Sequence, residues 1–181
     1  AMLWGIAFNV IFPFLLIYVQ HYLGYSLIEA SLIVFIALVV SLIATIPVGL
    51  IIDKFGRRKT VIAAIIFESL SMIIFSQAND YFSLGIAATG LIFGMMAFDV
   101  ASKTWSRDLF PDNKRGQFSG YYIIFTVLAA MGIGPFIGDA ITKNLGTPII
   151  IDGQPGFIPP NWIFIIGGLL SLLALIPLYF A

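Results

Sequence analysis

The feature that most constrains this chain is a series of six long apolar segments joined by short polar ones. A helix needs about 20 apolar residues to cross the ~30 Å hydrocarbon core of a bilayer, and six segments come close to or exceed that length. They cover residues 2–20, 27–52, 61–78, 81–102, 116–139 and 161–181. Their apolar runs are continuous rather than alternating, which predicts helices and not the strands of a membrane barrel. We therefore expect an all-α integral membrane protein, a single bundle of six transmembrane helices over residues 1–181.

The composition excludes several other classes of protein. Charged residues make up 10% of the chain, against about 25% in a soluble domain. The absence of cysteine excludes a disulfide scaffold. Nine basic and nine acidic residues balance to zero, which argues against a nucleic-acid partner. The sequence contains no phosphate-binding glycine loop, catalytic triad or metal-ligand cluster, so we expect neither an enzyme nor a cofactor nor a metal site.

The basic residues predict how the chain is oriented in the membrane. All but Lys143 fall in two loops on the same side, after the second and fourth segments: Lys54, Arg57, Arg58, Lys59, Lys103, Arg107, Lys114 and Arg115. Because basic loops stay in the cytoplasm, both loops and both chain termini are expected there. We expect a multi-pass protein of the plasma membrane.

The loop after the second segment carries a specific pattern. From Gly49 to Arg58 it reads Gly-x-x-x-Asp-Lys-x-Gly-Arg-Arg, which places an acid at a helix end, a glycine suited to a tight turn and then a cationic cluster. A charged loop of this kind also serves as a plain positive-inside anchor. The pattern nevertheless resembles, at every fixed position, the signature loop of the major facilitator superfamily. Residues 108–116 resemble the D-x-x-P…R-G segment of the same family.

The resemblance implies a fold and a mechanism. This chain would be the N-terminal six-helix half of a transporter, built from two inverted three-helix repeats, with a second half supplied by the same native chain or by a second copy. Transport would proceed by alternating access. Arg57 would pair with Asp53 and with Asp108, and the cluster would dock on the second half in one conformation. The residues assigned to this gating cluster are Gly49, Asp53, Lys54, Gly56, Arg57, Arg58, Asp108 and Arg115.

The fifth segment resembles part of the Gly-Pro motif of drug-efflux antiporters in the same superfamily. Small residues four apart allow close helix crossing, and a proline kinks the helix. The residues predicted to pack in this way are Gly134, Pro135 and Gly138. The match is incomplete, because Ala130 and Tyr121 stand where glycines are expected and Asp139 replaces the closing glycine. The basic residue that many proton antiporters carry in the fourth span is also absent around residues 87–90.

Glu68 is an acid inside a predicted span. It lies eight residues past Thr60, about 12 Å into the bilayer, where a charge costs about 2.5–3.5 kcal/mol on insertion scales. Every basic residue is expected in a loop, so Glu68 is either protonated, exposed to a wet cavity, or paired with a basic residue of the second half. All three suit a coupling site. A hydrogen bond to Ser69, Ser71 or a backbone carbonyl for packing alone is the structural alternative.

Other polar and aromatic residues are candidates for a transport path. Asp99 lies four residues before Lys103, where it either forms an ordinary ion pair or lines the cytoplasmic mouth of a cavity. Glu68 and Asp99 are therefore the candidates for proton coupling. Met and aromatic side chains accept varied lipophilic ligands. The candidate cavity residues are Asn9, Phe12, Met95, Met96, Tyr121 and Tyr122.

These features favour proton-coupled efflux of small lipophilic compounds, as in multidrug antiporters. The alternatives are uptake of a polar nutrient, such as a sugar or an organic anion, and a six-helix module that transports nothing by itself. The expected partners are the lipid bilayer, a small-molecule substrate, protons and a C-terminal six-helix half.

Overall fold

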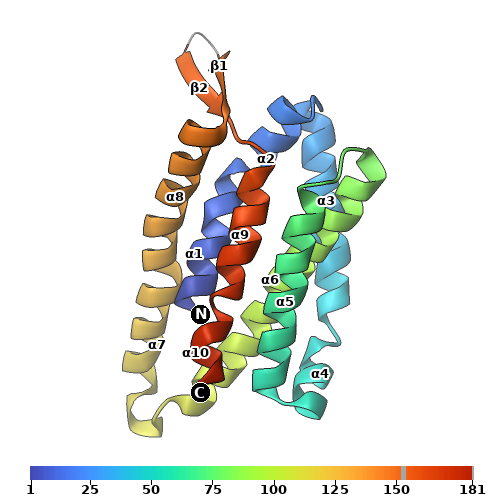
Figure 1. The fold of residues 1–181 in the computed structure, drawn as a ribbon. Helices are drawn as coiled ribbons and strands as arrows, with labels where there is room; N and C mark the ends of the chain where they lie inside the picture. Colours follow the sequence, from blue (N-terminus) through green and yellow to red (C-terminus); the bar gives the residue numbers. More distant parts are fainter. Residues whose placement is uncertain (152–153, 181) are drawn as a thin grey trace.

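Long helices run the length of the molecule, and a small β-hairpin stands at one end (Figure 1). The computed structural model describes residues 1–151 and 154–180. The elements are α1 (Met2–Ile11), η1 (Phe12–Phe14), α2 (Leu15–Ile17), η2 (Tyr18–Tyr22), α3 (Leu27–Thr45), α4 (Val48–Phe55), α5 (Arg57–Phe75), α6 (Tyr81–Leu109), η3 (Asp112–Lys114), α7 (Arg115–Ile123), η4 (Ile124–Leu128), α8 (Ala129–Leu145), β1 (Thr147–Ile151), β2 (Gln154–Ile158), α9 (Trp162–Leu172) and α10 (Leu175–Tyr179). The predicted all-α membrane class is confirmed, with the hairpin as an addition.

Five helical stretches within the described residues are long and apolar enough to cross a membrane: Met2–Tyr22, Leu27–Thr45, Tyr81–Leu109, Asp112–Leu145 and Trp162–Tyr179. Helix α5 lies among them but does not meet that test. Its first turn carries Arg57, Arg58 and Lys59, and Glu68 follows in its middle. The predicted count of six spans therefore depends on assigning α5 to the membrane.

The starts of several helices follow from local hydrogen bonding. Ser26 and Glu29 form a capping box at the start of α3, in which each side chain accepts the other residue's backbone N–H. Asp80 caps α6 by accepting the N–H groups of Phe82 and Ser83. The Ser83 hydroxyl also donates to this carboxyl and lowers the pKa of Asp80. These caps fix where α3 and α6 begin.

The basic segments differ from the predicted loops. Only Gly56, with φ of 86°, separates α4 from α5, so the cations at 57–59 form a first helical turn rather than a loop. Similarly, α6 continues to Leu109, which places Lys103, Arg107 and Asp108 on a helix. The prediction of a loop at these residues was wrong. Lys and Arg are good helix formers, and no Gly or Pro interrupts the chain between Lys103 and Phe110.

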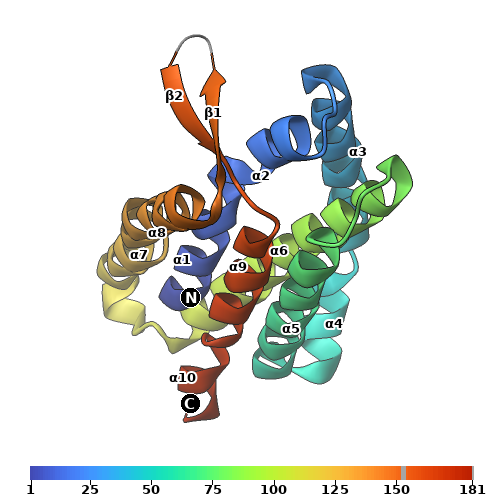
Figure 2. The same ribbon diagram turned by 45° about the horizontal axis from the view of Figure 1, so that its top comes forward.

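The β-hairpin was not predicted. Strands β1 and β2 pair antiparallel, with Thr147 opposite Ile158 and Ile149 opposite Gly156. This stretch between the fifth and sixth predicted spans contains several Pro and Gly residues, and proline weakens a strand prediction. A two-stranded sheet tolerates them, since each strand has one free edge. Figure 2 shows the hairpin standing above α8, with β2 leading into α9.

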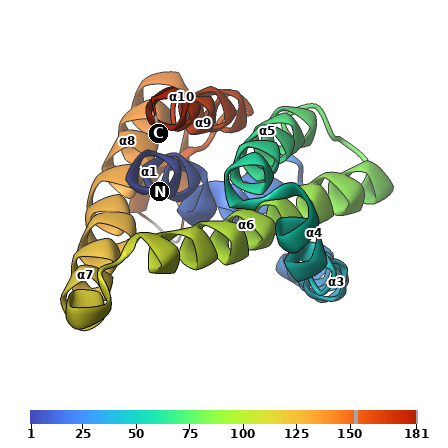
Figure 3. The same cartoon turned by 90° about the horizontal axis from the view of Figure 1, so that it is seen from below.

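Helix α1 occupies the middle of the bundle. Seen from below, it lies between α8, α9 and α6, while α6 slants across the molecule from the α7 corner to beyond α5 (Figure 3). The most extensive helix packing joins α5 to α6, α3 to α6 and α1 to α8. One apolar core lies around α1, α3 and α9, and a second lies toward the lower end around α4, α5 and α6.

Glycines permit the closest of these crossings. A Cβ built on Gly134 would come within 2.5 Å of the Cβ of Asn9, so α8 packs directly on α1 there. On α6, a Cβ on Gly94 would lie 2.7 Å from the Cβ of Glu68 on α5. Gly49 behaves differently, because nothing lies within 4 Å of its Cβ position. No helix therefore approaches Gly49 closely among the described residues.

The α1–α8 crossing gives a first prediction. Gly134→Val should destabilise the protein by about 1–3 kcal/mol, because the added atoms must displace the α1 backbone. Gly132→Val is the matched control on the same helix, since nothing lies within 4 Å of Gly132. Thermal unfolding of both variants in detergent tests the contact. An equal loss of stability in the two would show that helix propensity, and not the crossing, sets the cost.

Candidate functional site

Charged side chains gather at the lower end of the bundle, between the α4–α5 turn and the end of α6. Arg57 forms an ion pair with Asp108, and both side chains are a little under half exposed. They line a recess of about 430 Å³ that also includes Asp53 and Trp105. No ion pair of Asp53 occurs within the described residues. Of the two predicted partners of Arg57, the structure thus shows Asp108.

The other members of the predicted gating cluster have different roles. The Arg58 guanidinium donates to the carbonyl of Leu178 at 2.6 Å, so it caps the end of α10 and ties it to α5. The Lys54 ammonium lies over the Phe55 ring, 5.3 Å from its centroid. Arg115 pairs with Asp112 at 2.7 Å, three residues away in the sequence, and does not join the recess.

Glu68 is completely buried in the middle of α5. The Trp4 indole N–H of α1 donates to its Oε2 atom, and its Oε1 atom has no hydrogen-bond partner among the described residues. Neither Ser69 nor Ser71 is hydrogen-bonded to Glu68. The Ser71 hydroxyl donates instead to the Phe67 carbonyl, and the Ser69 hydroxyl has no partner among the described residues. An ionised carboxylate in this place would need more donors and a counter-charge.

Trp4 connects Glu68 to its surroundings. Its ring stacks on Phe98 of α6, with centroids 3.9 Å apart, and it begins an aromatic row along α1 that continues through Phe8 and Phe12. The same residue lines a pocket of about 430 Å³ between α1, α6 and α7. One side chain therefore contacts the buried acid, helix α6 and a pocket.

The wall of this pocket carries an ion pair. Asp99 and Lys103 lie 2.6 Å apart on α6, each about half exposed, and both line the pocket together with Arg107. The i,i+4 pair expected for Asp99 is present. The Tyr122 hydroxyl of α7 lies 2.9 Å from the Ser102 hydroxyl of α6 and closes the pocket on that side. The structure thus brings together Asp99 and Tyr122 from the predicted coupling and cavity residues.

The remaining candidate cavity residues do not line this pocket. Asn9 donates to the carbonyl of Gly5 on its own helix. Phe12 is 60% and Tyr121 49% exposed on the bundle surface. Met95 and Met96 are half-buried on α6. Of the helix-packing residues, Gly134 and Gly138 both lie against α1, and Pro135 is inside α8.

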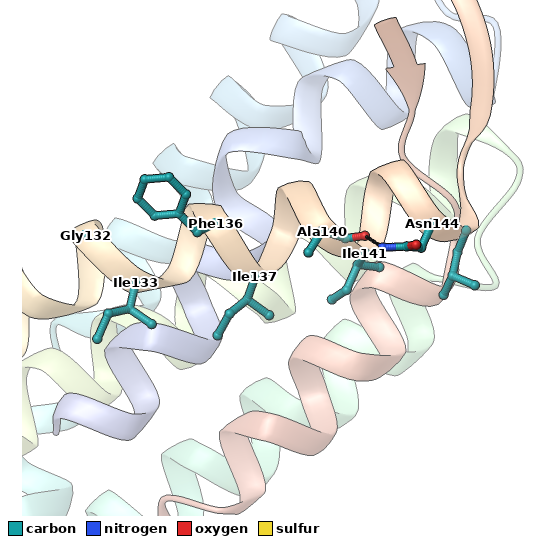
Figure 4. A pocket seen from close by; sticks show the side chains of 8 residues that line it. Gly132, Ile133, Phe136, Ile137, Ala140, Ile141 and Asn144 are labelled. Atoms are coloured by element: carbon teal, nitrogen blue, oxygen red, sulfur yellow. Dashed lines mark hydrogen bonds between the residues drawn. The ribbon is translucent and has the colours of Figure 1, made fainter.

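Another recess lies along α8 and has a volume of about 700 Å³. Figure 4 shows Ile133 and Ile137 pointing to one side of this helix and Phe136 to the other. The polar side chain there is Asn144, whose amide donates to the Ala140 carbonyl of the preceding turn. A recess lined mainly by apolar side chains suits the acyl chains of lipids. We therefore place the candidate site at the polar pocket, the one between α1, α6 and α7.

Three features were not predicted from the sequence. They are the hydrogen bond from Trp4 to Glu68, the capping of α10 by Arg58, and the position of Lys103 and Arg107 in one pocket. A signal for Trp4 existed: a buried indole N–H needs an acceptor, and Glu68 is a buried acid that needs a donor. For Arg58, the free carbonyls at a helix end gave a general reason to expect a cation. Neither signal identifies which residue is the partner.

The comparison with known proteins agrees with this geometry. Residues 1–181 match the family model described as Major Facilitator Superfamily. The chain belongs to the major facilitator superfamily. The predicted resemblance is confirmed, and several of the residues on which it was based line the recess around Arg57 and Asp108. Membership identifies a multi-pass membrane protein of a transporter family.

Two curated relatives are named transporters. The Na(+), Li(+), K(+)/H(+) antiporter of Planococcus maritimus is 27% identical over 73% of this chain. The arabinose-proton symporter of Bacillus subtilis (strain 168) is 32% identical over 75% of it. The matched regions cover 32% and 28% of those proteins, so the chain spans about a third of the length of each relative. The superfamily member described here thus has one relative named an antiporter and one named a symporter.

Proposed function

We propose that this chain is the N-terminal half of a secondary active transporter of the plasma membrane that couples efflux of small lipophilic molecules to protons. Helix α5 then counts as the third of six spans in two inverted repeats, and both chain ends lie in the cytoplasm. The single observation that carries the proposal is Glu68, a fully buried acid with one hydrogen-bond donor and no described cation beside it.

Glu68 suits proton coupling because its burial depends on helix position. In this conformation the described residues offer no counter-charge, so the side chain carries its proton. Rocking of the two halves would expose the side of α1 that carries Trp4 to a water-filled cavity. Water then reaches the carboxyl group and the proton leaves. A titratable group that is dry in one state and wet in another can link proton movement to alternating access.

The charge cluster at the lower end is proposed as the gate. Arg57 and Asp108 join α5 to α6, while Arg58 joins α5 to α10, so three spans move as one unit at this end. Gly49 faces open space on the neighbouring α4, which leaves room for a helix of the second half. Exposed ion pairs contribute only about 0–1 kcal/mol each and can form and break during a transport cycle.

Efflux of lipophilic compounds is supported by the aromatic row Trp4, Phe8 and Phe12 beside the polar pocket. The named proton antiporter among the relatives supports exchange against protons. Uptake of a polar nutrient is the second candidate, because the arabinose-proton symporter is 32% identical to this chain. Asp99 is a second candidate for the coupling proton, although its pairing with Lys103 makes it the weaker one.

The experiment that tests the proposal measures flux into and out of proteoliposomes that contain the complete native protein. An imposed proton gradient should drive accumulation of lipophilic probes such as ethidium or 1-naphthoate against their gradient by exchange. Accumulation of arabinose in symport, without movement of these probes, would favour the second candidate. Flux by residues 1–181 alone would contradict the half-transporter assignment, unless cross-linking shows a homodimer.

The proposed gate gives a further prediction. Asp108→Asn should slow transport several-fold while leaving substrate affinity unchanged, because it removes the partner of Arg57 at the gate and touches no part of the pocket. Asp112→Asn is the matched control, since Asp112 pairs with the nearby Arg115 and with no other basic residue in the described part of the chain. Transport rates and equilibrium binding of both variants in the complete protein check this. Loss of binding in Asp108→Asn would argue against a gating role.

A further inference from the structure

The pocket between α1, α6 and α7 has a charge that its own residues do not balance. Its lining contains the basic residues Lys103 and Arg107 and the single acid Asp99. Asp99 is engaged with Lys103 at 2.6 Å, whereas Arg107 has no ion pair within the described residues. The lining side chains thus leave one positive charge for a ligand, at a guanidinium whose fork of N–H groups matches a carboxylate or sulfonate.

Of the four hydroxyl groups that line the pocket, three are engaged, and that of Ser119 makes no hydrogen bond among the described residues. Tyr122 and Ser102 bond to each other at 2.9 Å. The hydroxyl of Thr126 donates to the carbonyl of Tyr122, and that of Ser106 donates to the carbonyl of Ser102. A sugar needs many free donors and acceptors, and this wall offers few of them. The basic groups are left as the strongest donors available to a ligand.

The other walls of the pocket are apolar. Trp4 and Phe110 stand at its sides, and Ile123 and Val127 line it from α7 and η4. An inorganic anion would gain nothing from these side chains, whereas an aromatic or alkyl body would be removed from water against them. A volume of about 430 Å³ is within the usual range for a small-molecule site, about 300–1,000 Å³.

From this arrangement we propose that the pocket binds amphiphilic organic anions, with the anionic group at Arg107 and Lys103 and the apolar body against Trp4 and Phe110. The inference rests on the proposed function and names its substrate class. The positive-inside rule explains why basic residues occur at this end of the bundle, but it does not require them to line a pocket beside aromatic rings. An efflux substrate would enter here from the cytoplasmic side.

Equilibrium binding to the complete native protein in nanodiscs of zwitterionic lipid tests the proposal, without any proton gradient. The probe is radiolabelled 1-naphthoate, and the neutral 1-naphthamide has the same shape without the charge. Naphthoate should bind, and Arg107→Gln should weaken its affinity about tenfold, the loss expected for one charged hydrogen bond. Lys114→Gln, a nearby basic residue outside the pocket, should leave affinity unchanged.

The outcomes separate this proposal from the proposed function. Equal affinity for naphthoate and naphthamide, or an unchanged affinity in Arg107→Gln, would overturn the anion site. Unfolding curves of the variants would show whether a loss of binding reflects a loss of fold, and Arg107→Lys, which keeps the charge, should restore part of the affinity. If naphthoate binds through Arg107 but no proton gradient moves it, the site stands and proton-coupled efflux fails.

Discussion

Glu68→Gln in the complete protein should abolish substrate accumulation driven by a proton gradient, although substrate still binds. Glutamine has nearly the same shape, and its carbonyl oxygen can still accept the Trp4 N–H, but it has no proton to release. The variant should still exchange substrate across the membrane at equal concentrations, because that exchange does not require coupling. Gradient-driven uptake and counterflow in proteoliposomes distinguish the two activities.

Glu29→Gln is the matched control for this prediction. Glu29 is an exposed acid at the start of α3, where it completes the capping box with Ser26, and glutamine preserves that motif. The control should accumulate substrate like the unmodified protein. Gradient-driven accumulation that survives in Glu68→Gln would remove Glu68 from the coupling mechanism and leave Asp99 as the remaining candidate.

Trp4→Phe should reduce gradient-driven accumulation about tenfold, because it removes the described donor to Glu68 and with it about 1–3 kcal/mol. Phenylalanine keeps a ring in contact with Phe98, so the packing between α1 and α6 is largely preserved. If Trp4 acts through the acid, the double variant Trp4→Phe, Glu68→Gln should be no worse than Glu68→Gln alone.

Two comparisons make this result interpretable. Trp162→Phe changes an exposed tryptophan at the start of α9 and should have little effect on accumulation. Exchange at equal concentrations provides the second comparison, because it is still measurable when coupling is lost. A further drop in exchange in the double variant would mean that Trp4 has a separate role, such as holding the wall of the pocket.

Much of the fold was predictable from the sequence because membrane crossing imposes length and hydropathy on each segment. The helix breaks at Gly24 and around Asp80 lie where the polar residues indicated. The pairing of Arg57 with Asp108 came from a family resemblance and not from any periodicity, since these residues are far apart in the chain. The end of α6 was predicted too early, because charged residues were taken as a loop signal and no sequence rule forbids a charged helical turn outside the membrane.

The candidate site was less predictable. Glu68 stood out in the sequence, yet its partner Trp4 lies 64 residues away, and only the packing of α1 against α5 and α6 brings them together. Gly94 permits α6 to approach α5 at Glu68, because a Cβ at position 94 would collide with that residue. The pocket likewise depends on the approach of α7 to α6 through Tyr122 and Ser102. Contacts between distant segments leave no local pattern, whereas helix faces and caps do.

The central claim is that Glu68 carries the proton that is exchanged for substrate. The most direct measurement counts the protons released when substrate binds to the complete protein in a weakly buffered solution that contains a pH indicator. Binding should release about one proton per substrate in the unmodified protein, as linkage requires when substrate binds better to the deprotonated protein, and none in Glu68→Gln. The same release from both proteins would contradict the account.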